Sequence, residues 1–148
     1  MGFICDLSEG KRLMERNGDH IVISCLPLDT VKSTFNEFSI LHLGEILSKE
    51  LLKIDKSHRN LAVETTLRQI LASNDKRELI ITDIDILFNP AYRLDVIKLF
   101  IQLARNRKII VQWPGEIDFQ YLIYSTPEYE DYRRYSIKDY DIICLRAL

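Results

Sequence analysis

The chain has 148 residues, of which 47% are hydrophobic and 28% charged, with a formal net charge of −2 at pH 7. This length and composition predict one globular domain over residues 1–148 and exclude a disordered or fibrous protein. The nearly balanced charge gives no general attraction to nucleic acid or anionic membrane, so any contact with DNA would need a local basic patch.

The first half of the chain is predicted to alternate helices with short buried strands. Residues 5–18 are typical of a helix that ends at Asn17-Gly18, a pair suited to a left-handed C-terminal cap. Residues 20–25 form an apolar run rich in β-branched side chains, as in a strand buried on both faces. The elements expected next are a loop over 26–31, a helix from near Lys32 to Phe38, a strand over 39–42, and helices over 44–54 and 58–73. The last helix has four apolar side chains on or near one face: Leu61, Leu67, Ile70 and Leu71.

The second half begins with another apolar strand, over 79–83, that ends in acidic residues. Asn89-Pro90 is a good helix start, because a capping side chain precedes a proline in the first turn. The elements expected after it are a buried helix over 94–106, strands over 108–113 and 119–124, a helix over 125–135 with Thr126 as its cap, and a strand over 140–145. This alternation predicts an α/β fold with a mainly parallel central sheet flanked by helices, in which Ile80 and Ile110 are buried.

In such sheets, ligands bind at the carboxyl ends of the strands. After the first strand, the stretch "IVISCLPLDTVKSTFNEF" places Lys32-Ser33 where a phosphate loop of pattern G-x-x-x-x-G-K-[ST] has its lysine and hydroxyl. Lys32 would bind phosphate, and Ser33 or Thr34 would be a magnesium ligand at a helix N-terminus.

The composition of this loop argues against a complete phosphate site. The two glycine positions are occupied by Leu26 and Val31, and Asp29 would bring a negative charge beside the phosphates. Glycine lets successive backbone N–H groups turn inward, whereas β-branched Val31 is poor at unusual backbone angles. The alternative for Lys32 is a solvated lysine in the first turn of a helix.

Asp83 and Asp85 follow the strand over 79–83, and they are the candidate catalytic acids. In phosphate-loop ATPases an acid at the end of a second buried strand holds magnesium, so Ser33 and Asp83 would share the metal. Asp83 is expected on a strand next to the first one, with its carboxylate facing the loop over 26–31. The alternative is an ordinary pair of acids in a strand-to-helix loop.

Three further polar residues are candidates for contact with a nucleotide. Gln112, near the end of its strand, has the place where related ATPases sense the terminal phosphate. Arg105 and Arg107 precede that strand and could reach a neighbouring subunit's nucleotide, as an arginine finger does, or a DNA phosphate. Their alternative role is to complement a helix C-terminus.

Six of the seven tyrosines lie in the C-terminal segment, interleaved with Arg133 and Arg134. This segment could form a stacking surface for nucleic acid, a partner interface, or simply aromatic packing on the sheet. The three cysteines, Cys5, Cys25 and Cys144, have no metal-ligand spacing, and Cys25 and Cys144 lie in strand-like runs and are most simply small core residues. Without a bilayer-spanning run or signal-peptide core, the sequence predicts a cytoplasmic protein with no membrane contact.

The run "ITDIDILFNPAYRLDVIKLFIQLARNRKIIVQWPG", followed by "YLIYSTPEYEDYRRY", resembles the BrxF family. This is the small P-loop-containing component of type 3 BREX bacteriophage-defence systems. The resemblance implies a P-loop NTPase-like fold, ATP with magnesium as a cofactor, and a place among other BREX proteins. It also maps the phosphate-loop role onto Lys32 and Ser33, and the acidic-strand role onto Asp83.

Two hypotheses about function follow. The first is a nucleotide-binding switch or accessory subunit of a BREX system, with negligible ATP hydrolysis by the isolated chain. The second is a non-catalytic adaptor that binds BREX partners or DNA without nucleotide. Self-association of the chain and direct contact with DNA stay open.

Overall fold

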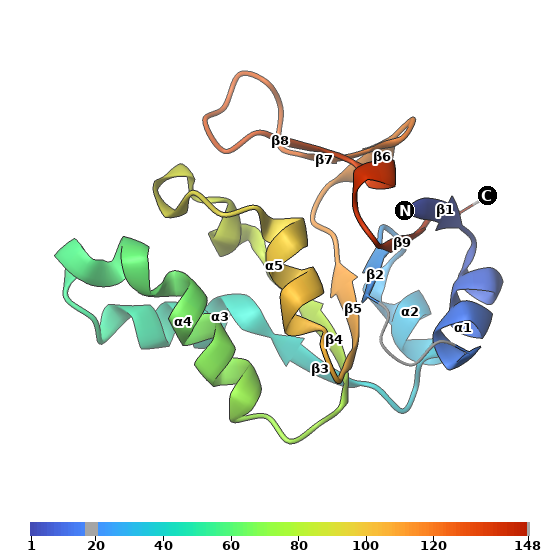
Figure 1. Ribbon diagram of the computed structural model, residues 1–148, viewed down its shortest axis with the longest axis horizontal. Coiled ribbons are helices and arrows are strands. Elements are labelled where there is room, and N and C mark those ends of the chain that lie inside the picture. The colour runs from blue at the N-terminus through green and yellow to red at the C-terminus, as the bar shows by residue number, and fades with distance from the viewer. Residues whose placement is uncertain (17–20, 148) are drawn as a thin grey trace.

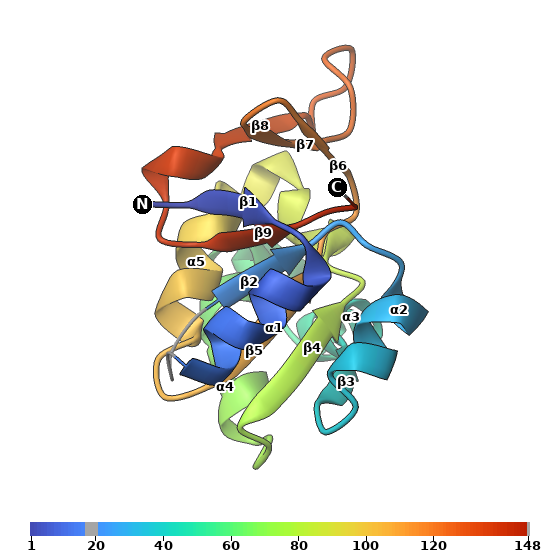
Figure 2. The same ribbon diagram turned by 90° about the vertical axis from the view of Figure 1, so that its right-hand side faces the viewer.

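A computed structural model describes residues 1–16 and 21–147. Its central feature is a sheet of six parallel strands in the order β1-β9-β2-β5-β4-β3, with helices on both faces (Figures 1 and 2). The strands of this sheet are β1 (Phe3–Cys5), β2 (Ile21–Ser24), β3 (Ser39–His42), β4 (Glu78–Thr82), β5 (Lys108–Gln112) and β9 (Ile143–Leu145). The α-helices are α1 (Leu7–Arg16), α2 (Leu28–Thr34), α3 (Leu43–Leu52), α4 (Arg59–Ala72) and α5 (Val96–Leu103). Four 3₁₀ turns are η1 (Lys56–His58), η2 (Asp85–Phe88), η3 (Pro90–Tyr92) and η4 (Ile137–Asp139).

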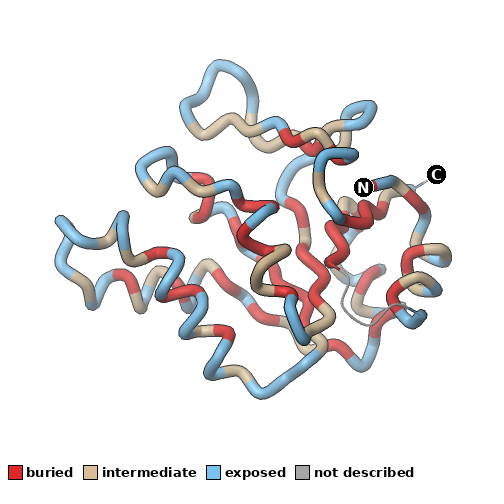
Figure 3. Tube along the Cα trace, viewed as in Figure 1, coloured by how far each residue is buried: buried red, intermediate tan, exposed pale blue. Residues whose placement is uncertain are grey.

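The central strands separate two hydrophobic clusters, because successive side chains of a strand point to opposite faces. Val22, Ile80 and Ile110 pack with α1 and α2 on one face. Ile23 and Ile81 belong to the larger cluster on the other face, which α3, α4 and α5 cover. Figure 3 shows this buried band along the middle of the molecule. The predicted α/β architecture with a parallel central sheet is confirmed, and Ile80 and Ile110 are fully buried as expected.

Helix α4 departs from the predicted pattern at one position. Leu67 and Leu71 are buried and Ile70 is half-buried, but Leu61 is 86% exposed. Val63 and Thr66 are buried on the inner face instead. The prediction for Leu61 is therefore wrong, because at 3.6 residues per turn Leu61 lies on nearly the opposite side of α4 from Val63, Thr66 and Ile70.

The C-terminal segment contains the largest difference from the prediction. Residues 125–135 are predicted to be a helix, but residues 125–132 form turns and strand β8 (Arg133–Ser136) follows them. With β6 (Glu116–Asp118) and β7 (Tyr121–Tyr124), β8 makes a second, small antiparallel sheet. Thr126 begins a turn, accepting at its carbonyl from the N–H of Tyr129, and is not a helix cap. Leu122 and Tyr135 lie directly opposite each other in β7 and β8, and both are buried in the main core. Pairing the two strands thus buries aromatic and aliphatic side chains that a surface helix would expose.

The N-terminus also differs from the prediction. Residues 3–5 form edge strand β1 beside β9, and the helix begins only at Leu7. The predicted cap at Asn17-Gly18 and the predicted strand residue His20 lie outside the described residues. Asn89 behaves as expected at the start of η3, where its side chain accepts from the N–H of Ala91.

Candidate functional site at the carboxyl edge of the sheet

Because the six strands of the central sheet are parallel, their carboxyl ends meet at one edge. β2 ends there at Ser24, β5 at Gln112, and β4 at Thr82, which Asp83 follows. The sheet therefore brings the segment after β2, the polar end of β5 and the acids after β4 to the same edge, as the sequence predicts.

The segment between β2 and α2 is short and its backbone is already bonded. The N–H of Cys25 donates to the Leu145 carbonyl at 2.9 Å, and the N–H of Leu26 donates to Ser24 Oγ at 3.1 Å. Pro27 has no N–H, so none of the three residues after β2 offers a free donor. The Leu26 side chain is buried in the core. A phosphate cradle needs several inward-turned N–H groups, and this segment has none.

Helix α2 begins at Leu28, not near Lys32, so the predicted loop over 26–31 is wrong. Pro27 has φ −56°, which is suited to a helix start. Because the turn around Val31 is helical, the Val31 side chain is buried against the sheet. Lys32 consequently lies in the last turn of α2.

The Lys32 ammonium is occupied by backbone carbonyls. Nζ donates to the carbonyl of Asn36 at 3.0 Å and to that of Phe38, immediately before β3 begins. Both carbonyls lie beyond Phe35, the C-cap residue of α2, so the ammonium ties the last turn of α2 to the segment that leads into β3. Ser33 is exposed, and the Thr34 carbonyl accepts from Lys11 Nζ at 3.0 Å. The cation and hydroxyl of the Lys-Ser motif thus lie near the start of β3, whereas Asp83 follows the end of β4.

Asp83 lies on the expected edge but not on the expected strand. β5 separates β2 from β4, so Asp83 does not follow a strand that neighbours β2. Its carboxylate Oδ2 is 3.6 Å from Nδ1 of His42, at the end of β3, rather than facing the segment after β2. Both side chains are more than half exposed. Ser33 and Asp83 do not converge, so together they do not fit a shared magnesium ion.

The backbone at Asp83 is unusual. Its φ of 59° is in the left-handed region, which is uncommon for a residue other than glycine. A Cβ added at Gly44 would approach the Asp83 carbonyl oxygen to 2.8 Å, so a larger residue at position 44 would displace this turn. Close packing between the start of α3 and the end of β4 therefore holds Asp83 beside His42.

Asp85 connects the two sheets. Its Oδ2 accepts from the Tyr124 hydroxyl at 3.1 Å, and the Tyr124 ring stacks on Phe88 with centroids 4.0 Å apart. Burial, followed by the charge of Asp85 and their hydrogen bond, raises the pKa of Tyr124 to about 12. In this arrangement Asp85 anchors the small sheet.

Gln112 and the two arginines also have structural partners. Gln112 Nε2 donates to the Leu26 carbonyl at 2.6 Å, which ties the end of β5 to the segment after β2. Arg107 Nη2 donates to the carbonyls of Leu71 and Asn74 at 2.5 and 2.8 Å, the first in the last turn of α4 and the second just after the helix. The alternative role of complementing a helix C-terminus therefore applies to Arg107, while Arg105 is exposed.

The three thiols are free. Cys144 is a buried core residue as predicted, and Cys5 is buried as well, whereas Cys25, the other predicted core cysteine, is only partly buried. Cys25 is half-buried, and burial together with the charge of Glu116 raises the pKa of its thiol to about 12. Within residues 1–16 and 21–147, no group of three His, Cys, Asp or Glu side chains is placed to hold a metal ion.

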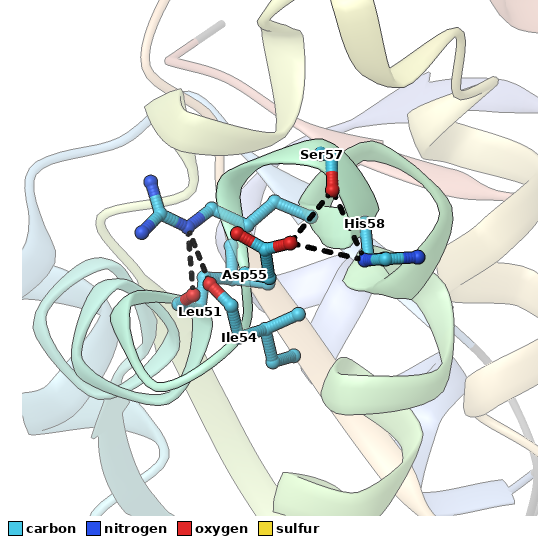
Figure 4. A network of polar contacts seen from close by, with 6 residues as sticks. Leu51, Ile54, Asp55, Ser57 and His58 are labelled. Atoms are coloured by element: carbon cyan, nitrogen blue, oxygen red, sulfur yellow. Dashed lines mark hydrogen bonds and ion pairs between the residues drawn. The ribbon is translucent and has the colours of Figure 1, made fainter.

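A second polar cluster, which the sequence analysis did not identify, lies at the start of α4 (Figure 4). Ser57 Oγ donates to Asp55 Oδ2 at 2.8 Å and lies 3.2 Å from His58 Nδ1, and the carboxylate is 3.6 Å from that same nitrogen. A Ser-His-Asp relay requires the acid and the hydroxyl on different ring nitrogens, so this arrangement is not a catalytic triad. The cluster orders an exposed turn before the helix.

Comparison of the chain with models of known protein families, with curated proteins and with solved structures gave no match. Across the described ranges, no helix has the length and apolar character needed to cross a membrane.

Proposed function

We propose that this chain is a non-catalytic accessory subunit of a BREX-type bacteriophage-defence assembly, which binds partner proteins and does not hold nucleotide by itself. The main support for the absence of nucleotide binding is that the three residues after β2 have no free N–H. Cys25 and Leu26 donate within the fold, and Pro27 has no N–H. The bonds of Lys32 to two carbonyls point the same way, because an occupied ammonium is not available to a phosphate. The BREX part of the proposal rests on the resemblance of the segments over 81–115 and 121–135 to the BrxF family.

Calorimetric titration of the purified chain with ATP and magnesium tests the absence of nucleotide binding. We expect no saturable heat at millimolar ATP and no phosphate release above the level of buffer. Saturable binding that Lys32→Ala abolishes would contradict this part of the proposal.

The place in a defence assembly is tested by complementation. In cells that carry a type 3 BREX system without its small P-loop-containing component, expression of this chain should restore resistance to phage in a plaque assay. Unchanged plaque numbers, with the chain expressed and soluble, would contradict the assignment to BREX.

One observation favours the second candidate, a nucleotide-dependent switch. Gln112, Asp83 and the segment after β2 share the carboxyl edge of a parallel sheet, which is where α/β proteins bind their ligands. In this alternative a partner would open the segment after β2 and add the missing donors in trans. Nucleotide binding that depends on an added partner protein, and is lost in Asp83→Asn, would favour the switch over the adaptor.

A further inference from the structure

A groove lies beside the lateral edge of the central sheet that strand β3 forms. β3 is the last strand in the sheet order and pairs with β4 only, so within the described residues its other edge has no strand partner. Next to it is a cavity of about 430 Å³, lined by residues of β3, α3, α4 and the turn after α4. The two helices lie side by side and cover the same face of the sheet (Figure 1). An unpaired strand edge presents N–H and C=O groups that can pair with another chain.

The lining of the cavity combines aliphatic and polar groups. Leu41 comes from β3, Ile46 from α3 and Ile70 from α4. Ile46 is a large aliphatic side chain, yet it is 37% exposed. A chain bound in the groove would cover it. Hydroxyl and amide side chains of α4 line the same cavity, among them Thr66 and Gln69. This volume and mixed chemistry suit one or two side chains of a bound peptide.

Glu50 is the ionisable side chain of this lining. Its carboxylate pairs at 3.0 Å with Lys53, the C-cap residue of α3, and the side chains of Glu50 and Lys53 are 43% and 70% exposed. An exposed pair of this kind contributes little stability, so an incoming cation can replace the lysine at small cost. The charge of the lining therefore favours a basic side chain next to an apolar one.

We propose that an extended segment of a partner protein adds to the free edge of β3, with an aliphatic side chain in the cavity and a lysine or arginine beside Glu50. Residues two positions apart on a strand point to the same face, so the segment should carry its aliphatic and basic residues at that spacing. Main-chain hydrogen bonds to β3 would contribute affinity, and the cavity would contribute specificity. This inference rests on the proposed adaptor function and identifies the surface that it would use.

The probe is a phage-displayed library of random dodecapeptides, selected against the immobilised full chain. We expect enrichment of peptides with an aliphatic residue two positions from Lys or Arg. Enriched peptides should bind Ile46→Arg at least tenfold more weakly, because this change puts a cation into the apolar part of the groove. Glu50→Lys should exchange the selected basic residue for Asp or Glu.

Glu64→Lys is the matched control. Glu64 is also an exposed glutamate in an ion pair within one helix, here with Arg68, but it does not line this cavity. The Glu64→Lys variant should bind the enriched peptides with unchanged affinity and should select peptides of the same sequence. Amide hydrogen exchange on Ser39–His42 should slow at least tenfold when an enriched peptide is added, and each variant's fold is checked by thermal unfolding.

Other outcomes would overturn the inference. Equal selection by wild type and Ile46→Arg, or protection confined to elements other than β3, excludes this groove. Self-association of the wild type that Ile46→Arg abolishes would assign the groove to a second copy of the chain instead. Saturable binding of ATP with magnesium would contradict the adaptor function without affecting the peptide result, so the two failures can be distinguished.

Discussion

At the residue scale, long cationic side chains bind backbone carbonyls at the ends of helices or in the segment that follows. Lys32 does so after α2 and Arg107 after α4, and both were candidates for phosphate contact. Carbonyls at helix ends lack intrahelical partners, and burying them without a donor is unfavourable. The positions of these cations in the sequence are compatible with either role, and the hydrogen bonds of the folded chain favour the structural one.

Replacing Lys32 should therefore change stability rather than nucleotide binding. We expect Lys32→Ala to lower the free energy of unfolding by about 1 kcal/mol, because one partly buried and one exposed contact to carbonyls are lost. Urea unfolding followed by circular dichroism measures this. Ser33→Ala is the control, since this exposed side chain should be silent; a nucleotide-dependent effect of either change would restore the phosphate-loop interpretation.

Arg107→Ala should lower the free energy of unfolding by about 2 kcal/mol, because it removes the donor to the Asn74 carbonyl and one of the donors to the Leu71 carbonyl, which also accepts from the N–H of Asn74. The neighbouring Arg105→Ala removes an exposed cation and should change stability by less than about 0.5 kcal/mol. Thermal unfolding of both variants makes the comparison. Equal effects would show that Arg107 has no special part in ending α4.

At the scale of elements, the small antiparallel sheet is attached to the main core by a few side chains. Trp113 Nε1 donates to the Ile123 carbonyl at 2.9 Å, and Leu122 from β7 is fully buried. At Gly115 an added Cβ would collide with the carbonyl of Ile123. The chain between β5 and β6 therefore passes β7 closely, in a space that glycine fits.

Leu122→Ala should destabilise the protein by about 3 kcal/mol, the usual loss when a buried leucine is truncated and leaves a cavity. Phe119→Ala, in the turn before β7, changes a 76% exposed ring and should have an effect of less than about 0.5 kcal/mol. Denaturant unfolding tests both variants. A small effect of Leu122→Ala would mean that the small sheet contributes little to the common core.

At the scale of the whole molecule, several acidic groups are held in their neutral form by burial. The pKa of Cys25 and that of Tyr124 are each raised to about 12, and burial also raises those of Cys144 and Tyr140. In the unfolded chain these groups ionise at lower pH, so the unfolded state binds fewer protons in alkaline solution. The stability that they contribute is complete below about pH 9 and is lost as the pH rises toward 12.

The free energy of unfolding should consequently fall steadily between pH 9 and pH 11, the alkaline range where the unfolded thiols and phenols ionise. Urea titrations at a series of pH values measure the slope. Tyr124→Phe removes one of these groups, and its slope should be shallower than that of the wild type. An unchanged slope would show that Tyr124 ionises alike in the folded and unfolded chain, and a steeper slope would show that folding lowers its pKa; either result would contradict the prediction.

How far the sequence predicts this protein depends on the range of the interactions involved. The apolar β-branched runs predicted β2, β3, β4 and β5, and the alternation with helices predicted a parallel sheet, because both signals are local. The candidate residues Asp83 and Gln112 were correctly expected at strand ends. The helix over 125–135 was wrong because the tyrosines and charges of this segment fit a capped helix as well as a hairpin, and only the partner strand distinguishes them.

The tertiary structure alone decided which side chains meet. β5 lies between β2 and β4, so the acid after β4 contacts His42 of β3 rather than the segment after β2. Gln112 is 86 residues from its partner Leu26, and Arg107 is 36 from Leu71, so no local pattern encodes these bonds. The sequence by itself determined the strands of the central sheet apart from edge strand β1, since burial and backbone preference act within a few residues. The order of the strands determined the chemistry of its edge, since that depends on packing between segments far apart in the chain.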